Sequence, residues 1–177
     1  VGSEKYCPEF YKAIGNIKKA RIYVYGAGSK TGKTTLVDYL HILVPYIEGY
    51  REMKFYYFGW EISIEEKQAA FCAFFMAYKH GIPMDADRVQ GLIGTLTEEE
   101  QKYISDIYNN ELTEIFGVYD EEGSLETPGM ITYIETPMNA AEMETFLRKE
   151  MLQYGEFKTS KRGLDYFVWH DNTKHVH

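Results

Sequence analysis

The ten residues from Gly26 to Thr35, GAGSKTGKTT, combine three glycines, two lysines and three threonines between two apolar runs. Glycine adopts backbone conformations that a Cβ would hinder, so such a loop can turn its amide groups inward toward an anion. The run that begins at Leu36 has apolar residues at helical spacing, and a helix there would direct the positive end of its dipole at the loop. The pattern therefore predicts a cradle for phosphate groups.

Read from Ala27, this segment matches the P-loop pattern, with alanine in place of the first glycine. Lys33 is expected to reach the β- and γ-phosphates of a nucleotide, and the Thr34 hydroxyl is the expected ligand of Mg²⁺. The expected cofactors are therefore ATP and Mg²⁺. The residues assigned to nucleotide binding are Ala27, Gly28, Ser29, Lys30, Thr31, Gly32, Lys33, Thr34 and Thr35.

Hydrolysis also needs a group that orients the attacking water, and two carboxylates follow apolar, strand-like runs. Glu61 comes after residues 55–58, and Glu135 comes after residues 131–134. Because the carboxyl ends of parallel strands share the edge where a phosphate loop lies, we assign Glu61 as the catalytic base. Lys33, through its contact with the phosphates, is the other catalytic residue. Glu135 is the alternative base, although it also begins a segment typical of a helix lead-in. Glu61 could instead only cap the following helix.

The elements that must position these residues alternate between strands and helices. Capping signatures at Ser63, Thr97 and Asn139 predict three helix starts, and Pro45 is expected to end or kink the helix that follows the phosphate loop. Helices are predicted over residues 8–17, 33–44, 63–80, 97–110 and 139–154, and strands over residues 22–25, 55–58, 130–134 and 165–169, with a further strand beginning within residues 174–177. This alternation predicts an α/β fold with a parallel sheet covered by helices on both faces.

The length of 177 residues corresponds to one domain, and a net charge of −8 argues against a chain that wraps nucleic acid on its own. There is no apolar run of membrane-spanning length and no signal-peptide pattern, so we expect a soluble, cytoplasmic protein without a membrane partner. Cys7 and Cys72 lack the spacing of a metal site or a disulfide framework, and both are expected to be buried thiols.

Four motifs in order resemble the ATPase core of DnaB-type replicative helicases, in a divergent phage version. They are the P-loop at residues 27–34, the segment FYYFGWEIS at 55–63, TEEE at 97–100, and YIETP at 133–137 followed by a helix. The segment at 58–63 is similar to the family's Ser-Leu-Glu-Met-Ser motif, whose glutamate is the base, and this supports Glu61. Only the P-loop is specific by itself.

The resemblance implies a RecA-like P-loop NTPase core with a mostly parallel sheet, in an ATP-hydrolysing, ring-forming replicative DNA helicase. It implies translocation on single-stranded DNA, a hexameric ring, possible replication partners and a location in the host cytoplasm. In the family, the Walker B aspartate, the arginine finger and the DNA loops lie further along the chain, past the position of residue 177. Residues 1–177 are therefore expected to be one incomplete C-terminal helicase domain, truncated before the Walker B strand.

Two other functions stay open from the residues alone. One is a different RecA-fold or P-loop ATPase, such as a recombinase-like protein or a packaging motor, which would share residues 26–35 without unwinding duplexes. The other is an assembly module that binds nucleotide without turnover, because no second carboxylate for Mg²⁺ is evident in the sequence.

Overall fold

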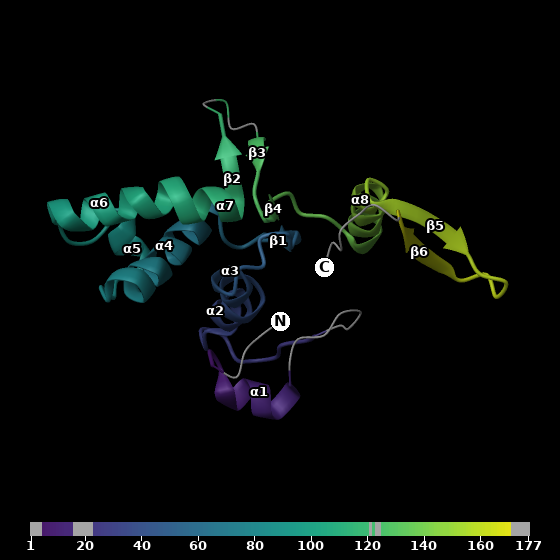
Figure 1. Cartoon of the computed structure of the whole chain (residues 1–177), viewed down its shortest axis with the longest axis horizontal. Coiled ribbons are helices and arrows are strands. Elements are labelled where there is room, and N and C mark those ends of the chain that lie inside the picture. Colours follow the sequence, from purple (N-terminus) through teal and green to yellow (C-terminus); the bar gives the residue numbers. More distant parts are fainter. Residues whose placement is uncertain (1–4, 16–22, 121, 123–124, 171–177) are drawn as a thin grey trace. The chain divides into compact units, whose positions relative to one another are not determined.

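The computed structural model describes residues 5–15, 23–120, 122 and 125–170 (Figure 1). They form two compact units, one up to Met53 and one from Lys54 onward. The strand expected within residues 174–177 lies outside the described residues.

The first unit is built from two helical segments. Helix α1 (Pro8–Ile14) begins with a proline in its first turn, where no intrahelical amide bond is lost, and Gly15 follows it with a φ of 71°. The second segment runs without a break from Lys33 to Ile47 and buries Leu40, Leu43 and Val44. It consists of helix α2 (Lys33–Asp38), a π-helical turn η1 (Tyr39–Leu43) and helix α3 (Val44–Ile47).

The helix does not end at Pro45, because the π-helical turn accommodates the proline. The Val44 amide donates to the Tyr39 carbonyl, five residues back, in the wider turn that directly precedes Pro45. Such a bulge relieves the contact between a proline ring and the preceding turn, and the helix continues to Ile47.

The strand predicted over residues 22–25 is absent from its described part. Residues 23–25 form no strand, and Val24 is 89% exposed, which a strand inside a sheet covered on both faces would not allow. Tyr25 is instead held through its side chain. Its ring stacks on Phe10 at 6.1 Å, and its hydroxyl is hydrogen-bonded to His41 Nε2 at 2.8 Å.

The second unit contains four helical segments and six strands among its described residues. The helices are α4 (Ile64–His80), α5 (Ala86–Val89), α6 (Glu98–Ile107) continued by η2 (Tyr108–Leu112) and α7 (Thr113–Phe116), and α8 (Ala140–Met151). The strands are β1 (Phe55–Phe58), β2 (Gly117–Tyr119), β3 (Leu125–Pro128), β4 (Ile131–Ile134), β5 (Gly155–Thr159) and β6 (Asp165–Trp169).

The three predicted capping signatures are confirmed as complete capping boxes. In each, the cap side chain accepts a hydrogen bond from the third helical amide, while the third side chain accepts one from the cap amide. The pairs are Ser63 with Glu66, Thr97 with Glu100, and Asn139 with Glu142.

The core of the second unit lies where α4 packs against α6, η2 and α7, and where α7 packs against β4. Phe71 on α4 meets Phe116 on α7, with ring centroids 5.3 Å apart. The other fully buried large side chains nearby are Phe75, Met76, Ile107, Leu112, Ile115 and Ile131.

Replacing Phe116 with alanine is expected to lower the free energy of unfolding by about 3–5 kcal/mol, because it removes a fully buried ring and leaves a cavity against Phe71. Urea denaturation followed by circular dichroism measures the change. Leu92, which is 70% exposed, is the control, and its replacement by alanine should change the same quantity by less than about 0.5 kcal/mol. Equal effects of the two substitutions would contradict this packing.

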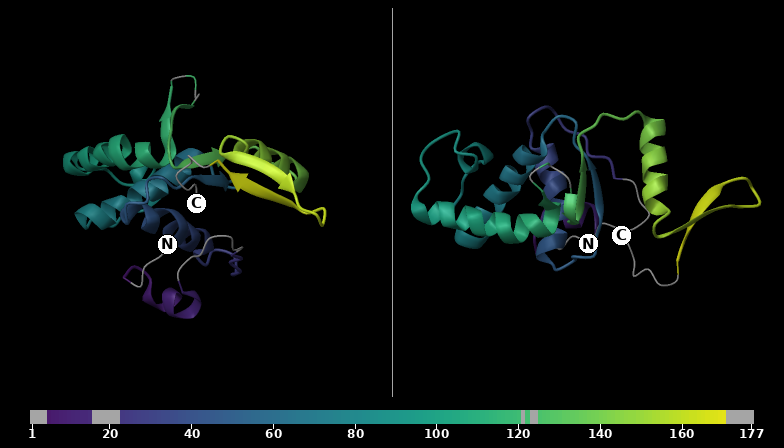
Figure 2. Two further views of the ribbon diagram at one scale, coloured as in Figure 1. Left: turned by 45° about the vertical axis from the view of Figure 1, so that its right-hand side comes forward. Right: turned by 90° about the horizontal axis from the view of Figure 1, so that it is seen from above.

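The prediction of a mostly parallel, RecA-like sheet with helices on both faces is wrong. The described residues form one two-stranded parallel sheet, β1 with β4, and two antiparallel pairs, β2 with β3 and β5 with β6. The predicted strand at 165–169 exists as β6, but its partner is β5, the strand before it in sequence. Figure 2 shows these two strands as a hairpin that follows α8.

The β5–β6 pairing has a local cause. Gly163, with a φ of 75°, lies in the connecting turn, and the Ser160 amide donates to the Leu164 carbonyl. Phe157 and Phe167 face each other across the two strands, with centroids 5.0 Å apart. A tight turn followed by a cross-strand aromatic pair favours a hairpin over a more distant parallel partner.

Candidate functional site: a phosphate loop and two carboxylates at a strand edge

The predicted phosphate loop is an exposed segment that leads into helix α2. Every residue from Gly26 to Thr35 is exposed. A Cβ added at Gly32 would meet no atom within 4 Å, and one at Gly28 would approach only a Thr31 methyl group, at 3.5 Å. The loop backbone therefore has open space beside it.

The loop has left-handed backbone at two alternating positions. Lys30 has a φ of 59° and is the only non-glycine residue with positive φ in the described part of the chain, and Gly32 has a φ of 78°. Alternation of left-handed and right-handed residues turns successive amides toward one side, which creates an anion-binding concavity. A hydrogen bond of 2.8 Å from the Thr31 hydroxyl to the Gly28 carbonyl closes the turn.

The first turn of α2 has amide groups that its N-cap residue leaves unpaired. The N-cap is Gly32, which has no side chain to accept from the following amides. Its carbonyl accepts from the Leu36 amide at 2.9 Å, so the helix begins directly at Lys33. All nine residues predicted to bind nucleotide lie in this one segment, and the Lys33 and Thr34 side chains come from the first turn of the helix.

Tyr25, directly before the loop, is an anchor that the sequence did not reveal. Burial raises the pKa of Tyr25, with a smaller contribution from the neighbouring Tyr23. Burial lowers the pKa of His41. Both groups are therefore neutral near pH 7, and their hydrogen bond fixes the entry to the loop against the helix that leaves it. Only the spacing of an aromatic residue before the loop and a histidine two turns into the helix could have suggested this contact.

Glu61 belongs to the second unit, in the connection between β1 and α4. Its side chain is exposed, and no hydrogen bond or ion pair engages its carboxylate within the described residues. The connection itself is held at both ends. The Gly59 amide donates to the Ile134 carbonyl at 3.1 Å, and Ser63 caps α4.

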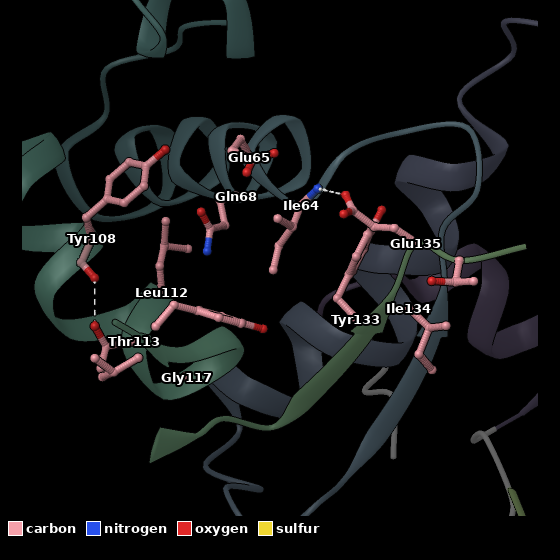
Figure 3. A pocket seen from close by; sticks show the side chains of 13 residues that line it. Ile64, Glu65, Gln68, Tyr108, Leu112, Thr113, Gly117, Tyr133, Ile134 and Glu135 are labelled. Carbon is pink, nitrogen blue, oxygen red and sulfur yellow. Dashed lines mark hydrogen bonds between the residues drawn. The ribbon is translucent and has the colours of Figure 1, made fainter. Parts of the chain in front are cut away.

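Glu135, the alternative base, has a structural partner. Its Oε1 accepts a hydrogen bond of 2.8 Å from the Ile64 amide, the first residue of α4, as Figure 3 shows. The carboxylate thus acts as an additional cap on that helix, which favours Glu61 as the acid that is available for chemistry.

The two carboxylates lie at the same strand edge, as expected for residues that follow paired parallel strands. Strands β1 and β4 are parallel, with Phe58 opposite Ile134, so Glu61 and Glu135 both follow the carboxyl ends of their strands. A parallel pair brings the ends of its strands to one edge, and this part of the site could be deduced from the sequence.

A cavity of about 750 Å³ opens beside this edge, and no sequence motif indicated it (Figure 3). It mixes carboxylates, an amide and aromatic rings, and no lysine, arginine or histidine is among the described residues that line it. A hydrogen bond from the Ser63 hydroxyl lowers the pKa of Glu65, so that carboxylate is charged near pH 7. Polar and aromatic members of the lining include Glu65, Gln68, Tyr108, Tyr119, Tyr133 and Glu135.

The two cysteines differ in burial. Cys72 is buried as predicted, and burial, with the nearby Glu111, raises the pKa of its thiol to about 12. Cys7 is only half-buried, so the prediction for it is wrong. Among the described residues, no three His, Cys, Asp or Glu side chains gather as a metal site would require.

No helix in the described part of the chain is both long enough and apolar enough to cross a membrane. Comparison with models of protein families, with curated proteins and with solved structures gives no match.

Proposed function

We propose that this chain binds ATP with Mg²⁺ through residues 27–35 and hydrolyses it with Glu61 as the base, as the ATPase core of a ring-forming replicative DNA helicase. The observation that supports nucleotide binding best is the loop backbone, left-handed at Lys30 and Gly32 and exposed directly before a helix. An anion is the ligand that inward amides and a helix N-terminus attract.

Each residue has a chemical role in this proposal. The amides of the loop hold the phosphate oxygens, and the Lys33 ammonium offsets charge on the β- and γ-phosphates. Thr34 would hold Mg²⁺ through its hydroxyl oxygen. Bound Mg²⁺ would neutralise charge on the phosphate oxygens. Glu61 orients a water molecule and takes its proton as the water attacks the γ-phosphorus and the bond to ADP breaks, which yields ADP and phosphate.

The helicase part of the proposal rests on the order of motifs in the sequence, because the sheet is not the one that the resemblance implied. The shared strand edge supports it, since Glu61 follows β1 as the family's base follows its strand. In this proposal the protein acts as a hexameric ring that moves along single-stranded DNA.

Calorimetric titration of the chain with ATP in the presence of Mg²⁺, with AMP as the matched ligand, tests nucleotide binding. AMP keeps the base and sugar but lacks the two phosphates that the loop and Lys33 would hold, so its affinity should be at least about 100-fold lower. Chelation of Mg²⁺ should weaken ATP binding and leave AMP unaffected. Equal affinities for ATP and AMP would contradict a phosphate-directed site.

Turnover and assembly separate the helicase from the two other functions. Phosphate release with a larger oligomer in ATP, together with strand displacement, supports the helicase. Phosphate release without strand displacement indicates another P-loop ATPase. Binding that changes oligomer size without phosphate release indicates an assembly module.

A further inference from the structure

We propose that Tyr133 is a positioning residue for Glu61, an inference that rests on the proposed role of Glu61 as the base. Tyr133 lies on β4, and Glu61 lies on the connection from β1 to α4, residues 59–63. The Tyr133 hydroxyl donates a hydrogen bond of 2.7 Å to the carbonyl of Ile62, the residue directly after Glu61. The tyrosine thus holds the connection at its middle, between the two ends that other contacts fix.

The same ring also occupies the space above Gly59. A Cβ on Gly59 would overlap the Tyr133 hydroxyl and lie 2.5 Å from Cζ of the ring. Only glycine therefore allows the ring to reach Ile62. This accounts for the glycine in the segment FGWEIS, and it places Glu61 between two points, Gly59 and Ile62, that contact one side chain.

Tyr133 is itself held by the strand pair and by α4. It is the direct neighbour of Tyr57 in the parallel register, and the two rings stack with centroids 5.1 Å apart and an interplanar angle of 11°. The Tyr57 hydroxyl accepts a hydrogen bond of 2.8 Å from Nζ of Lys67, a buried residue of α4. A rigid chain of contacts thus runs from α4 through both strands to the connection that carries Glu61.

The consequence is that the exposed carboxylate of Glu61 projects from a fixed backbone. A general base must hold the attacking water within hydrogen-bond reach of its carboxylate and close to the γ-phosphate. A displacement of the base by about 1 Å can lower the rate on the order of 100-fold. Loss of the Tyr133 contact should therefore reduce turnover without reducing nucleotide affinity, because the phosphate-binding residues are elsewhere in the sequence.

The first test replaces Tyr133 with phenylalanine, which keeps the ring and removes only the hydroxyl. We expect kcat for ATP to fall roughly 5- to 50-fold, within the range that misplacement of a catalytic group produces, with an unchanged dissociation constant for ATP. Tyr56→Phe is the matched control. It removes a hydroxyl from the neighbouring strand position whose bond goes to Glu150 of α8, and it should leave kcat within about twofold.

The second test is a double-mutant cycle between Gly59 and Tyr133. Gly59→Ala should lower kcat in the wild-type background, because the added methyl group must displace the ring. In a Tyr133→Ala background the obstructing ring is absent, and Gly59→Ala should have little further effect. Equal effects of Gly59→Ala in both backgrounds would overturn the proposed contact.

A third measurement reports on the connection without using turnover. Trp60 lies next to Glu61, and Trp169→Phe leaves it as the only tryptophan. Time-resolved fluorescence anisotropy should show a larger nanosecond local motion of Trp60 after Tyr133→Phe, and no change after Tyr56→Phe.

These readouts separate failure of this inference from failure of the proposed function. If the wild-type protein releases no phosphate, the proposed function fails and the assignment to Glu61 fails with it, whatever Trp60 reports. If the wild type turns over ATP and Glu61→Gln abolishes this, then an unchanged kcat in Tyr133→Phe overturns the positioning role. A lower kcat with unchanged Trp60 motion also overturns it.

Discussion

Replacing Lys33 with alanine is expected to weaken the binding of ATP with Mg²⁺ by roughly 10- to 100-fold. Hydrogen bonds to charged groups contribute about 1.5–3 kcal/mol, and each 1.4 kcal/mol corresponds to a tenfold change in affinity. Lys33 is exposed in the first turn of α2, so the substitution removes an ammonium group without opening a cavity in the protein core. Calorimetric titration with ATP measures the change.

Lys12→Ala is the control for this prediction. It makes the same change in net charge in the same unit, at an exposed side chain of α1 that pairs with Glu9. We expect its affinity for ATP to stay within about twofold of the wild type, because surface pairs contribute little and are screened by salt. Similar losses for the two variants would show that only general electrostatics is involved, and unaltered affinity in Lys33→Ala would remove the basis of the phosphate-loop assignment.

Features that depend on a few neighbouring residues could be predicted from the sequence. The helix starts after Ser63, Thr97 and Asn139 rest on reciprocal bonds within four residues, and all three form. Gly81 adopts the left-handed conformation that the end of α4 requires, with a φ of 69°. The interactions that stabilise these helix ends lie within the local sequence, so they can be predicted without knowledge of tertiary contacts.

The partner of the strand at residues 165–169 could not be predicted, because pairing is decided by contacts between distant residues. Residues 165–169 have the composition of a strand, but nothing within them distinguishes a parallel partner from the antiparallel β5. Residues 155–159 carry no clear strand pattern, since they begin with glycine and lead into a basic loop. The ends of two helices also differ from the prediction, because π-helical turns at 39–43 and 108–112 extend these helices beyond their predicted ends.

In the candidate site, too, features set by local sequence could be predicted, and features set by long-range contacts could not. The order of apolar run and carboxylate was enough to place Glu61 and Glu135 at one strand edge. The two hydrogen bonds that distinguish Glu61 from Glu135 could not be predicted from the sequence. The bond from Ile64 to Glu135 and the bond from Tyr133 to Ile62 each join residues 71 positions apart. Sequence could name the two acids, and tertiary structure was needed to show that one of them caps a helix.

Replacing Glu61 with glutamine is expected to lower kcat for ATP hydrolysis by about 100- to 10,000-fold, the usual contribution of a general base. Glutamine has nearly the same shape as glutamate but cannot accept the proton of the attacking water. The side chain is exposed, so the fold should tolerate the change. The dissociation constant for ATP should stay within about threefold, because the amides and Lys33 supply the binding energy. Phosphate release and calorimetry on the same preparation measure the two quantities.

Glu135→Gln is the matched control, since it makes the same chemical change at the other acid of the strand edge. The glutamine oxygen can still accept from the Ile64 amide, so α4 keeps its additional cap. Loss of the charge at the helix N-terminus should lower the free energy of unfolding by about 0.3–1 kcal/mol. Turnover should fall less than about threefold, because this carboxylate is engaged with the Ile64 amide. The opposite result, with turnover lost in Glu135→Gln and kept in Glu61→Gln, would transfer the role of base to Glu135.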